Sequence, residues 1–255
     1  MPVAQNLHLT YAHRGARDLA TENTLAAFRA AIQAGADGIE CDITRCASGE
    51  IVVIHDDTLD RTTNGSGKVL DTPFTALRKL DAGAWFSSVY AGERIPILAE
   101  VLDLAQNSLQ INIEIKGMDS QDDGVEVEVA TMLRQRRMQD AVIISSFNPW
   151  ALKRMHHAAA ELKCALLYTR ESPLNSATEW SLPLLRLQAV HPEFALVDHD
   201  YVSWAHNEGY LVNVWTVNEL ADMEKMIRLG VDGIITDHPA VLRRLLVNKL
   251  AVGRE

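Results

Sequence analysis

The chain of 255 residues is 47% hydrophobic, which suits one (β/α) barrel or two small domains and supplies ample apolar material for a core. Its net charge of -10 argues against a general affinity for nucleic acid or for an anionic membrane, because both attract basic surfaces. No stretch approaches the roughly 18 apolar residues that span a bilayer, and the first residues lack a basic run followed by an apolar one. We therefore expect a cytoplasmic protein without stable membrane association.

Short runs of β-branched residues alternate with helical patterns along the chain, and this order favours a parallel sheet. Eight strands are predicted, over residues 10–14, 38–43, 111–116, 142–147, 164–169, 189–191, 211–216 and 233–236. Helical patterns follow them, for example over residues 23–34, 125–137 and 221–229. Eight alternations within this length predict a single α/β domain over residues 1–255, closed as a TIM (β/α)8 barrel.

The alternation is broken once, after the second strand. Residues 51–54 predict an extra strand paired in a hairpin with the second one, and residues 56–96 lack a regular pattern until a helical period resumes at Leu98. A connection of roughly forty residues is long for one domain, and such segments are usually functional loops or inserted subdomains. We expect a small subdomain over residues 56–96 that caps the catalytic face, because the chain leaves the second strand at its carboxyl end.

Acidic side chains alternate with apolar ones on two predicted strands. Glu40 and Asp42 share one face of the second strand, and Glu114 lies on the corresponding face of the third. Burying such groups without partners costs several kcal/mol per ion. Oxygen-only ligands suit Mg2+ or Ca2+ better than zinc, which predicts a site for one divalent cation. The alternative is a structural salt-bridge network with Arg14 and Lys116.

Two basic residues accompany these carboxylates, and they suggest a class of substrate. Three carboxylates with Arg14 and Lys116 carry a net charge of about -1, which a divalent cation would turn to about +1. A phosphodiester monoanion would neutralise that charge, and the planar fork of arginine suits phosphate oxygens. Either residue alone would also fit a structural ion pair.

Two histidines lie at the same ends of predicted strands. His13 lies near the carboxyl end of the first predicted strand, and His55 follows the extra one. Imidazole titrates near neutral pH, so one ring can accept a proton from a nucleophile while the other donates a proton to a leaving oxygen. His191, at another strand end, is left undecided, and a structural role is preferred for the histidines at positions 8, 156, 157, 199 and 206.

Several other polar or aromatic residues have a simple structural interpretation. Asn23 and Asp237 each precede a predicted helix and are expected to be N-caps. Glu22 is ambiguous, because helix starts favour acids in any case. Phe147 and Trp215 could belong to the core or form an apolar wall for a substrate.

The ordered set of motifs resembles the bacterial glycerophosphodiester phosphodiesterases of the cytosolic type. The matching segments are His13-Arg14-Gly15, Glu22-Asn23-Thr24, residues 38–43, residues 55–65, residues 113–116, residues 214–218 and residues 233–237. They run through nearly the whole chain, and the ordered set is far more specific than any one segment. The resemblance implies a TIM barrel with a small insertion after the second strand.

The resemblance also implies a role for each matched residue. Glu40, Asp42 and Glu114 would bind the divalent cation, and Arg14 and Lys116 would hold the phosphate. The imidazoles of His13 and His55 would act as the acid-base pair, and the rings of Phe147 and Trp215 would contact the glycerol side. The substrate hydroxyl next to the ester would attack to give a cyclic phosphate, which water then opens. The products would be sn-glycerol 3-phosphate and an alcohol such as choline or ethanolamine.

Two alternatives stay open at this point. A lysophospholipase D-like phosphodiesterase would need an apolar groove for an acyl chain, for which the insertion looks too polar apart from Trp85, Phe86 and Tyr90. A catalytically silent barrel that binds glycerol phosphates would lack a histidine or a carboxylate, and none is missing. The preferred head group, Mg2+ against Ca2+, and monomer against homodimer are also left open.

Overall fold

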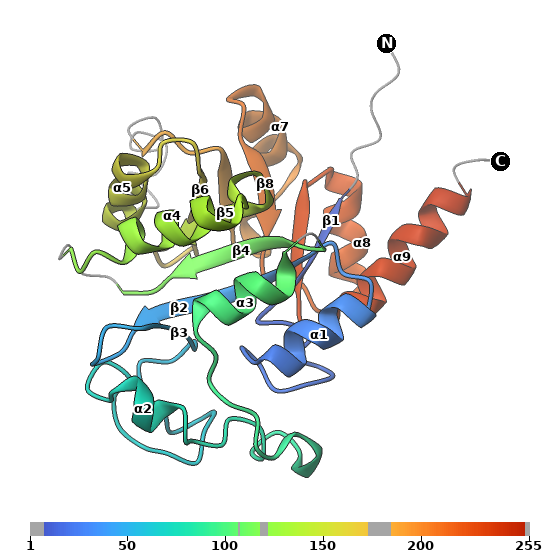
Figure 1. The fold of residues 1–255 in the computed structure, drawn as a ribbon. Coiled ribbons are helices and arrows are strands. Elements are labelled where there is room, and N and C mark those ends of the chain that lie inside the picture. Colours follow the sequence, from blue (N-terminus) through green and yellow to red (C-terminus); the bar gives the residue numbers. More distant parts are fainter. Residues whose placement is uncertain (1–7, 107, 118–121, 173–184, 253–255) are drawn as a thin grey trace.

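A closed barrel of parallel strands forms the centre of the molecule (Figure 1). The computed structural model describes residues 8–106, 108–117, 122–172 and 185–252. The sheet order is β1-β9-β8-β7-β6-β5-β4-β2, and β1 also pairs with β2, which closes the barrel and confirms the predicted fold class. The barrel strands are Leu9–Ala12 (β1), Gly38–Arg45 (β2), Gln110–Ile115 (β4), Val142–Ser146 (β5), Lys163–Tyr168 (β6), Ala189–Pro192 (β7), Leu211–Val214 (β8) and Gly233–Thr236 (β9).

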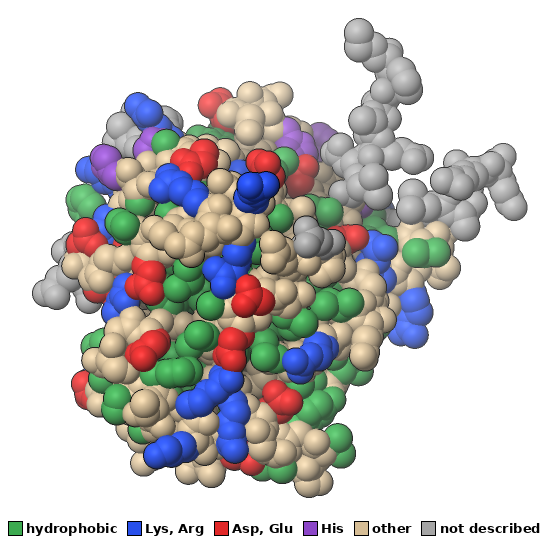
Figure 2. Space-filling model, in the orientation of Figure 1, with side chains coloured by type: hydrophobic (Ala, Val, Ile, Leu, Met, Phe, Trp, Pro, Cys, Tyr) green, Lys and Arg blue, Asp and Glu red, His purple; other side chains and the backbone are tan. Residues whose placement is uncertain are grey.

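Helices surround the barrel and connect its strands (Figure 1). They are Leu25–Gln33 (α1), Phe74–Leu77 (α2), Leu98–Ala105 (α3), Val125–Arg136 (α4), Pro149–Ala158 (α5), His199–Asn207 (α7), Leu220–Leu229 (α8) and Pro239–Val252 (α9), with short 3-10 turns at Ser88–Tyr90, Gln139–Ala141 and Phe194–Leu196. No helix among the described residues is long and apolar enough to cross a membrane. On the face drawn in Figure 2, acidic and basic side chains are interspersed over the described residues.

The alternation of side chains along β2 and β4 positions the acidic residues. Ile39, Cys41 and Ile43 of β2 lie in the main hydrophobic core, as do the three isoleucines of β4. The carboxylates between them therefore face the barrel interior. The parallel register pairs Asp42 with Glu114 on the neighbouring strand, while Glu40 is opposite Asn112, and the three carboxylates lie close together.

The insertion after β2 has a small hydrophobic core of its own. The short strand β3 (Ile51–Val53) pairs antiparallel with β2, as predicted, and the chain then runs through α2 before it enters α3. The core residues are Cys46, Val52, Ile54, Leu59, Val69, Leu77, Ala82 and Ile95. In Figure 1 the insertion lies beside the β2–β3 hairpin and the start of α3. It is thus a packed unit, although it contains little regular secondary structure.

Two predicted helix caps are wrong. The N-cap of α1 is Thr24, whose side chain accepts a hydrogen bond from the amide of Ala27. Asn23 instead adopts a left-handed backbone conformation, with φ of 55°, and turns its amide toward β2. Asp237 stands two residues before the first residue of α9, and its carboxylate pairs with His13. In both cases a contact across the barrel mouth takes the side chain that local sequence would assign to a cap.

Candidate active site

The nine residues expected at the site converge at the carboxyl ends of the barrel strands. A pocket of about 100 Å³ opens there, and its lining includes His13, Arg14, Glu40, His55, Glu114, Lys116, Phe147 and Trp215. The ninth residue, Asp42, lies just beneath and contacts both Arg14 and Lys116. Sequence reasoning missed four further lining residues, which are Asn112, Leu167, Thr216 and Ile235.

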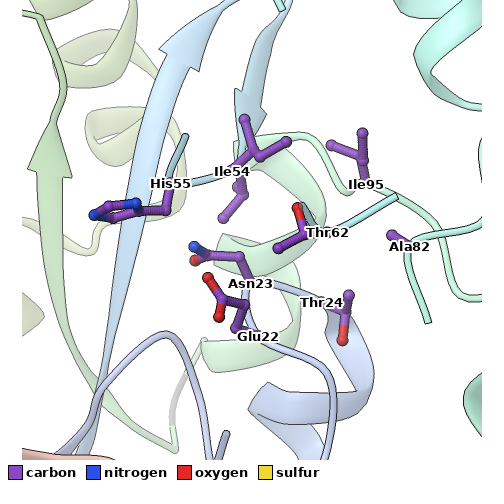
Figure 3. Close-up of a pocket in the computed structure, with 9 residues that line it drawn as sticks. Glu22, Asn23, Thr24, Ile54, His55, Thr62, Ala82 and Ile95 are labelled. Atoms are coloured by element: carbon purple, nitrogen blue, oxygen red, sulfur yellow. The ribbon is translucent and has the colours of Figure 1, made fainter. Parts of the chain in front are cut away.

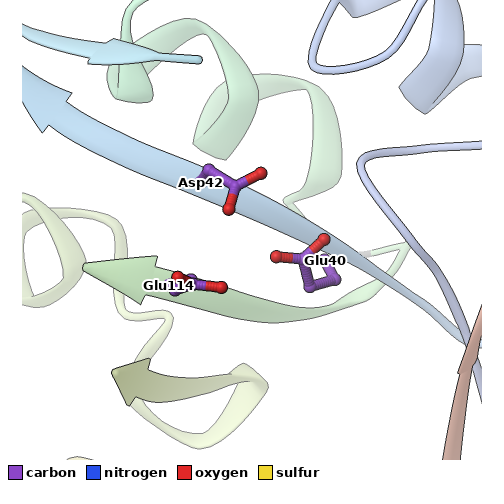
Figure 4. A group of neighbouring side chains, drawn as sticks. All are labelled: Glu40, Asp42 and Glu114. Atoms are coloured by element: carbon purple, nitrogen blue, oxygen red, sulfur yellow. The ribbon is translucent and has the colours of Figure 1, made fainter. Parts of the chain in front are cut away.

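Three buried carboxylates form the most highly charged part of the site. Figure 4 shows Glu40 and Asp42 along β2 with Glu114 on the adjacent β4. One oxygen from each lies within 4.8 Å of the others, a spacing suited to a shared cation. Burial and the neighbouring carboxylates raise the pKa of Glu40 well above its ordinary value and raise the pKa of Glu114 to about 7. The two glutamates therefore retain protons more readily than exposed carboxylates do, because burial and their neighbours disfavour the ionised forms.

Two basic side chains offset part of this charge. Lys116 Nζ lies 2.8 Å from Glu114 Oε1 and 3.5 Å from Asp42 Oδ1. Arg14 Nε lies 3.4 Å from Asp42 Oδ2, so Asp42 is held by both cations. The positive charges of Lys116 and Arg14 overcome the effect of burial and lower the pKa of Asp42. Part of the predicted structural salt-bridge network is therefore present.

The network leaves one carboxylate without a cationic partner. Glu40 accepts a hydrogen bond from the backbone amide of Arg14 at 2.9 Å, and within the described ranges no Lys, Arg or His nitrogen lies within 4.0 Å of its carboxylate. Salt bridges alone thus do not account for the cluster. An oxygen-coordinated divalent cation fits the three carboxylates.

The loop from β1 to α1 bends sharply to bring its side chains over the carboxylates. Arg14 has a φ of 54° and Gly15 a φ of 85°, so the chain leaves the strand in left-handed conformations. A Cβ at Gly15 would lie 2.6 Å from Cβ of Ala27, which explains glycine at this position. Further along the loop, Asn23 Nδ2 donates to Asp42 Oδ2 at 2.9 Å. Such backbone strain is typical of functional sites.

Each of the two histidines at the pocket is held by an aspartate. His13 Nδ1 lies 2.7 Å from Asp237 Oδ1, and His55 Nδ1 lies 2.6 Å from Asp56 Oδ1. With Nδ1 engaged, Nε2 of each ring is the nitrogen left for a ligand in the pocket. Burial lowers the pKa of His55, assisted by the positive charge of Arg14. Burial thus favours the neutral form of the His55 ring, against the opposing charge of Asp42.

Aromatic and aliphatic side chains also line the pocket. Phe147 and Trp215 pack edge to face, with ring centroids 5.5 Å apart and an interplanar angle of 88°. The indole Nε1 donates to the backbone oxygen of His191 at 2.8 Å, which fixes the ring. Leu167 and Ile235 extend this apolar lining. Both aromatic rings thus line the pocket beside the charged groups.

A second, much smaller pocket of about 10 Å³ lies behind His55 (Figure 3). It is lined by Glu22, Asn23, Thr24, Val53, Ile54, His55, Thr62, Ala82 and Ile95. In Figure 3 the ring of His55 projects away from Ile54 and Ile95. Space for about one water is too little for a substrate. This region is where the insertion packs against the β1–α1 loop.

Glu22, which sequence reasoning left ambiguous, is the centre of a cluster of three arginines. Its carboxylate accepts hydrogen bonds from Arg14 Nη1 at 2.8 Å and from Arg61, and it lies 3.2 Å from Arg17 Nη2. Burial alone would raise its pKa, but hydrogen bonds from Arg61 and Arg14 lower the pKa of Glu22 to about 2. Glu22 is therefore ionised at neutral pH and holds cationic side chains at the site.

His191, which was undecided, lies fully buried inside the barrel. Its Nε2 is 2.9 Å from Asn213 Nδ2, and burial lowers the pKa of His191 to about 3. Other histidines have structural partners away from the pocket: His206 pairs with Asp232, and His157 Nδ1 lies 2.8 Å from the backbone oxygen of Lys153. These side chains are not part of the pocket lining.

Sequence comparison identifies the family. Residues 13–241 match the model of the glycerophosphoryl diester phosphodiesterase family. A glycerophosphodiester phosphodiesterase of Caldanaerobacter subterraneus subsp. tengcongensis is 40% identical over 240 residues, which cover 93% of this chain and 97% of the relative. A glycerophosphodiester phosphodiesterase of Bacillus subtilis is 32% identical over 253 residues, with 93% and 86% coverage.

Solved structures with the same fold include one with a bound product. A phosphodiesterase of Oleispira antarctica in complex with the product sn-glycerol-3-phosphate superposes with a TM-score of 0.84 at 30% identity, covering 94% of this chain and 96% of that one. A glycerophosphodiester phosphodiesterase of Agrobacterium tumefaciens superposes with a TM-score of 0.80 at 29% identity, covering 92% and 99%.

Proposed function

Since the chain belongs to the glycerophosphoryl diester phosphodiesterase family and is a glycerophosphodiester phosphodiesterase, we propose that it hydrolyses small glycerophosphodiesters to sn-glycerol 3-phosphate and an alcohol. Glycerophosphocholine and glycerophosphoethanolamine are the proposed substrates. The observation that carries this proposal is the convergence of three buried carboxylates, two basic side chains and two histidines on one pocket.

One divalent cation, Mg2+ or Ca2+, is the proposed cofactor, held by Glu40, Asp42 and Glu114. The all-oxygen set supports this assignment, as does the absence, among the described residues, of a Lys, Arg or His nitrogen within 4.0 Å of the Glu40 carboxylate. When bound, the cation would supply positive charge to the phosphate oxygens. It would also favour the ionised forms of Glu40 and Glu114, whose pKa values burial and mutual repulsion raise in its absence.

Arg14 and Lys116 are proposed to bind the phosphodiester. Both line the pocket, and both are paired with carboxylates through part of their hydrogen-bonding capacity. Arginine can direct remaining N–H groups at phosphate oxygens, and lysine contributes a point charge. Burial alone would lower the pKa of each, but the surrounding carboxylates raise both values, so both side chains stay charged.

His13 and His55 are proposed as the acid-base pair. The neutral imidazole of His55 suits the base, which takes the proton from the free glycerol hydroxyl next to the ester. That oxygen forms a bond to phosphorus while the bond to the head-group oxygen breaks, and His13 gives a proton to the departing alcohol. Water then opens the cyclic phosphate as the proton transfers run in reverse. Asp237 and Asp56 orient the two rings.

Phe147 and Trp215 are proposed to contact the carbon atoms of the glycerol. The insertion over residues 56–96 is proposed to cap this face, because His55 and Asp56 at its start belong to the pocket and to its support. The insertion also exposes Trp85 and Phe86, at 41% and 36%. These aromatic rings favour testing an acylated substrate alongside the small ones.

The test is release of sn-glycerol 3-phosphate from glycerophosphocholine by the purified protein. We expect activity that excess chelator removes and that Mg2+ or Ca2+ restores. A parallel assay with lysophosphatidylcholine should give much lower turnover. Activity that survives complete chelation would contradict the cation assignment, and a preference for the acylated substrate would favour the lysophospholipase D-like alternative. No turnover of any diester by folded protein supplied with each metal would contradict the proposed substrates.

A further inference from the structure

Arg61 of the insertion forms hydrogen bonds with two carboxylates, those of Asp56 and Glu22, which contact different residues of the site. Arg61 Nε and Nη2 donate to the two carboxylate oxygens of Asp56 at 2.6 and 3.0 Å. Its Nη1 and Nη2 donate to the two oxygens of Glu22 at 3.0 and 2.8 Å. A single guanidinium is thus shared between two bidentate pairs, which is a geometry that the planar fork of arginine allows and an ammonium does not.

Each of these carboxylates also holds a residue of the pocket. Asp56 Oδ1 lies 2.6 Å from His55 Nδ1. Glu22 Oε1 accepts from Arg14 Nη1 at 2.8 Å. A continuous path of hydrogen bonds therefore runs from His55 through Asp56, Arg61 and Glu22 to Arg14.

An ordinary surface ion pair does not describe this arrangement. Exposed pairs contribute little, and the side chain of Arg61 is 42% exposed. However, the Glu22 side chain is only 2% exposed, and Asp56 is 25% exposed. Glu22 must have cationic partners to remain buried and ionised, and hydrogen bonds from Arg61 are the largest influence that lowers its pKa. The two ion pairs of Arg61 thus join an exposed guanidinium to carboxylates that are largely buried at the site.

We propose that Arg61 is a positioning residue for the hydrolysis, acting on His55 through Asp56 and on Arg14 through Glu22. The inference rests on the proposed function, because it assigns Arg61 to support of the proposed base and of a proposed phosphate ligand. By this proposal the insertion contributes a residue that supports the active site. Arg61 lies two positions after Leu59, which belongs to the hydrophobic core of the insertion, so the packing of that core helps to position Arg61.

The test compares Arg61→Met and Arg61→Lys with a matched control, Arg78→Met. Arg78 also belongs to the insertion, is 37% exposed and forms a bidentate pair with Glu100, which lies outside the pocket lining. Steady-state kinetics with glycerophosphocholine give kcat and KM, and inhibition by sn-glycerol 3-phosphate reports binding of the phosphate. Thermal melting of each variant measures any loss of stability.

We expect Arg61→Met to lower kcat by about 10- to 100-fold and to weaken inhibition by sn-glycerol 3-phosphate several-fold, because both supports are released. Arg61→Lys, which can keep one carboxylate, should recover part of the loss. Arg78→Met should keep kcat and the inhibition constant within about twofold, although it also removes a bidentate ion pair of the insertion. Equal effects of Arg61→Met and Arg78→Met would overturn the proposal.

A double-mutant cycle separates positioning from general destabilisation. If Arg61 acts in part through Asp56, then Arg61→Met should lower kcat by a smaller factor in the Asp56→Asn background than in the wild type. Multiplicative effects on kcat would overturn that path. Should Arg61→Met fail to fold, Arg61→Lys and Arg61→Gln carry the same comparison. An inactive wild type would contradict the proposed function. If the wild type is active and His55→Ala is not, wild-type kinetics for Arg61→Met would contradict only this inference.

Discussion

His13 and Asp237, which lie 224 positions apart in the sequence, are joined by a 2.7 Å contact between Nδ1 and Oδ1. The aspartate is itself fixed, because Asn218 Nδ2 donates to its other oxygen at 2.9 Å. A carboxylate at Nδ1 selects the ring form and orientation in which Nε2 faces the pocket. The residue that follows β9 therefore orients the residue that follows β1.

This contact predicts that Asp237→Asn lowers kcat substantially while the melting temperature changes little. We expect a loss of about 10- to 100-fold, because the ring of His13 would lose its orienting anion while the asparagine keeps the shape of the side chain. Steady-state kinetics and thermal melting check this. Asp232→Asn is the matched control, since Asp232 pairs with His206 away from the pocket. Similar kcat values for the two variants would refute the orienting role.

The proposed acid-base pair predicts that His13→Ala and His55→Ala each reduce turnover of glycerophosphocholine by at least roughly a hundredfold. Circular dichroism should show an intact fold, because both rings are at the barrel mouth and not in its core. His157→Ala, which changes an exposed histidine, serves as the control. Near wild-type turnover by either pocket variant would remove that residue from the pair.

The proposed cation site predicts a defined phenotype for Glu114→Gln. Removing one of three anionic ligands should weaken the response to metal, and activity should recover in part when the Mg2+ or Ca2+ concentration is raised. The measurement is activity against free metal concentration for wild type and variant. A lower maximum rate with an unchanged metal midpoint would assign Glu114 a role other than binding the cation.

Metal binding is also expected to be visible without any substrate. Divalent cations should raise the melting temperature of the wild type, because they bind the folded state and relieve repulsion among three buried carboxylates. Glu40→Gln should reduce this rise, and isothermal titration calorimetry should report weaker binding. The control is Glu50→Gln, which changes an acidic side chain outside the cluster. An identical rise in wild type and Glu40→Gln would place the cation elsewhere.

Much of the barrel could be predicted because its strands obey a strong local rule. The alternation of Glu40 and Asp42 with apolar neighbours fixes which side chains face inward, and the structure confirms the closed barrel. The family motifs then indicate a role for each matched position. These roles stay predictions until the variants are measured.

The supporting contacts could not be predicted, because they depend on long-range geometry. Asn23 and Thr24 are both good N-cap residues, and only the contact of Asn23 with Asp42 decides which of them caps the helix. Arg61 sits in an irregular segment in which any basic residue would pass for a surface charge. Its partner Glu22 is 39 positions away, and no sequence period links them.

The buried His191 predicts how stability depends on pH. Burial lowers its pKa to about 3, whereas an unfolded histidine titrates near 6.5. Between these values the unfolded state binds more protons, so His191 costs nothing above pH 6.5 and destabilises the folded protein as pH falls toward 3. The slope is at most about 1.4 kcal/mol per pH unit.

His191→Gln keeps an acceptor for Asn213 Nδ2 but cannot titrate. Urea unfolding at pH 7.5 and 5.0 should therefore show that the wild type loses about 2 kcal/mol more than this variant. Parallel losses in wild type and His191→Gln would mean that His191 is protonated within the fold.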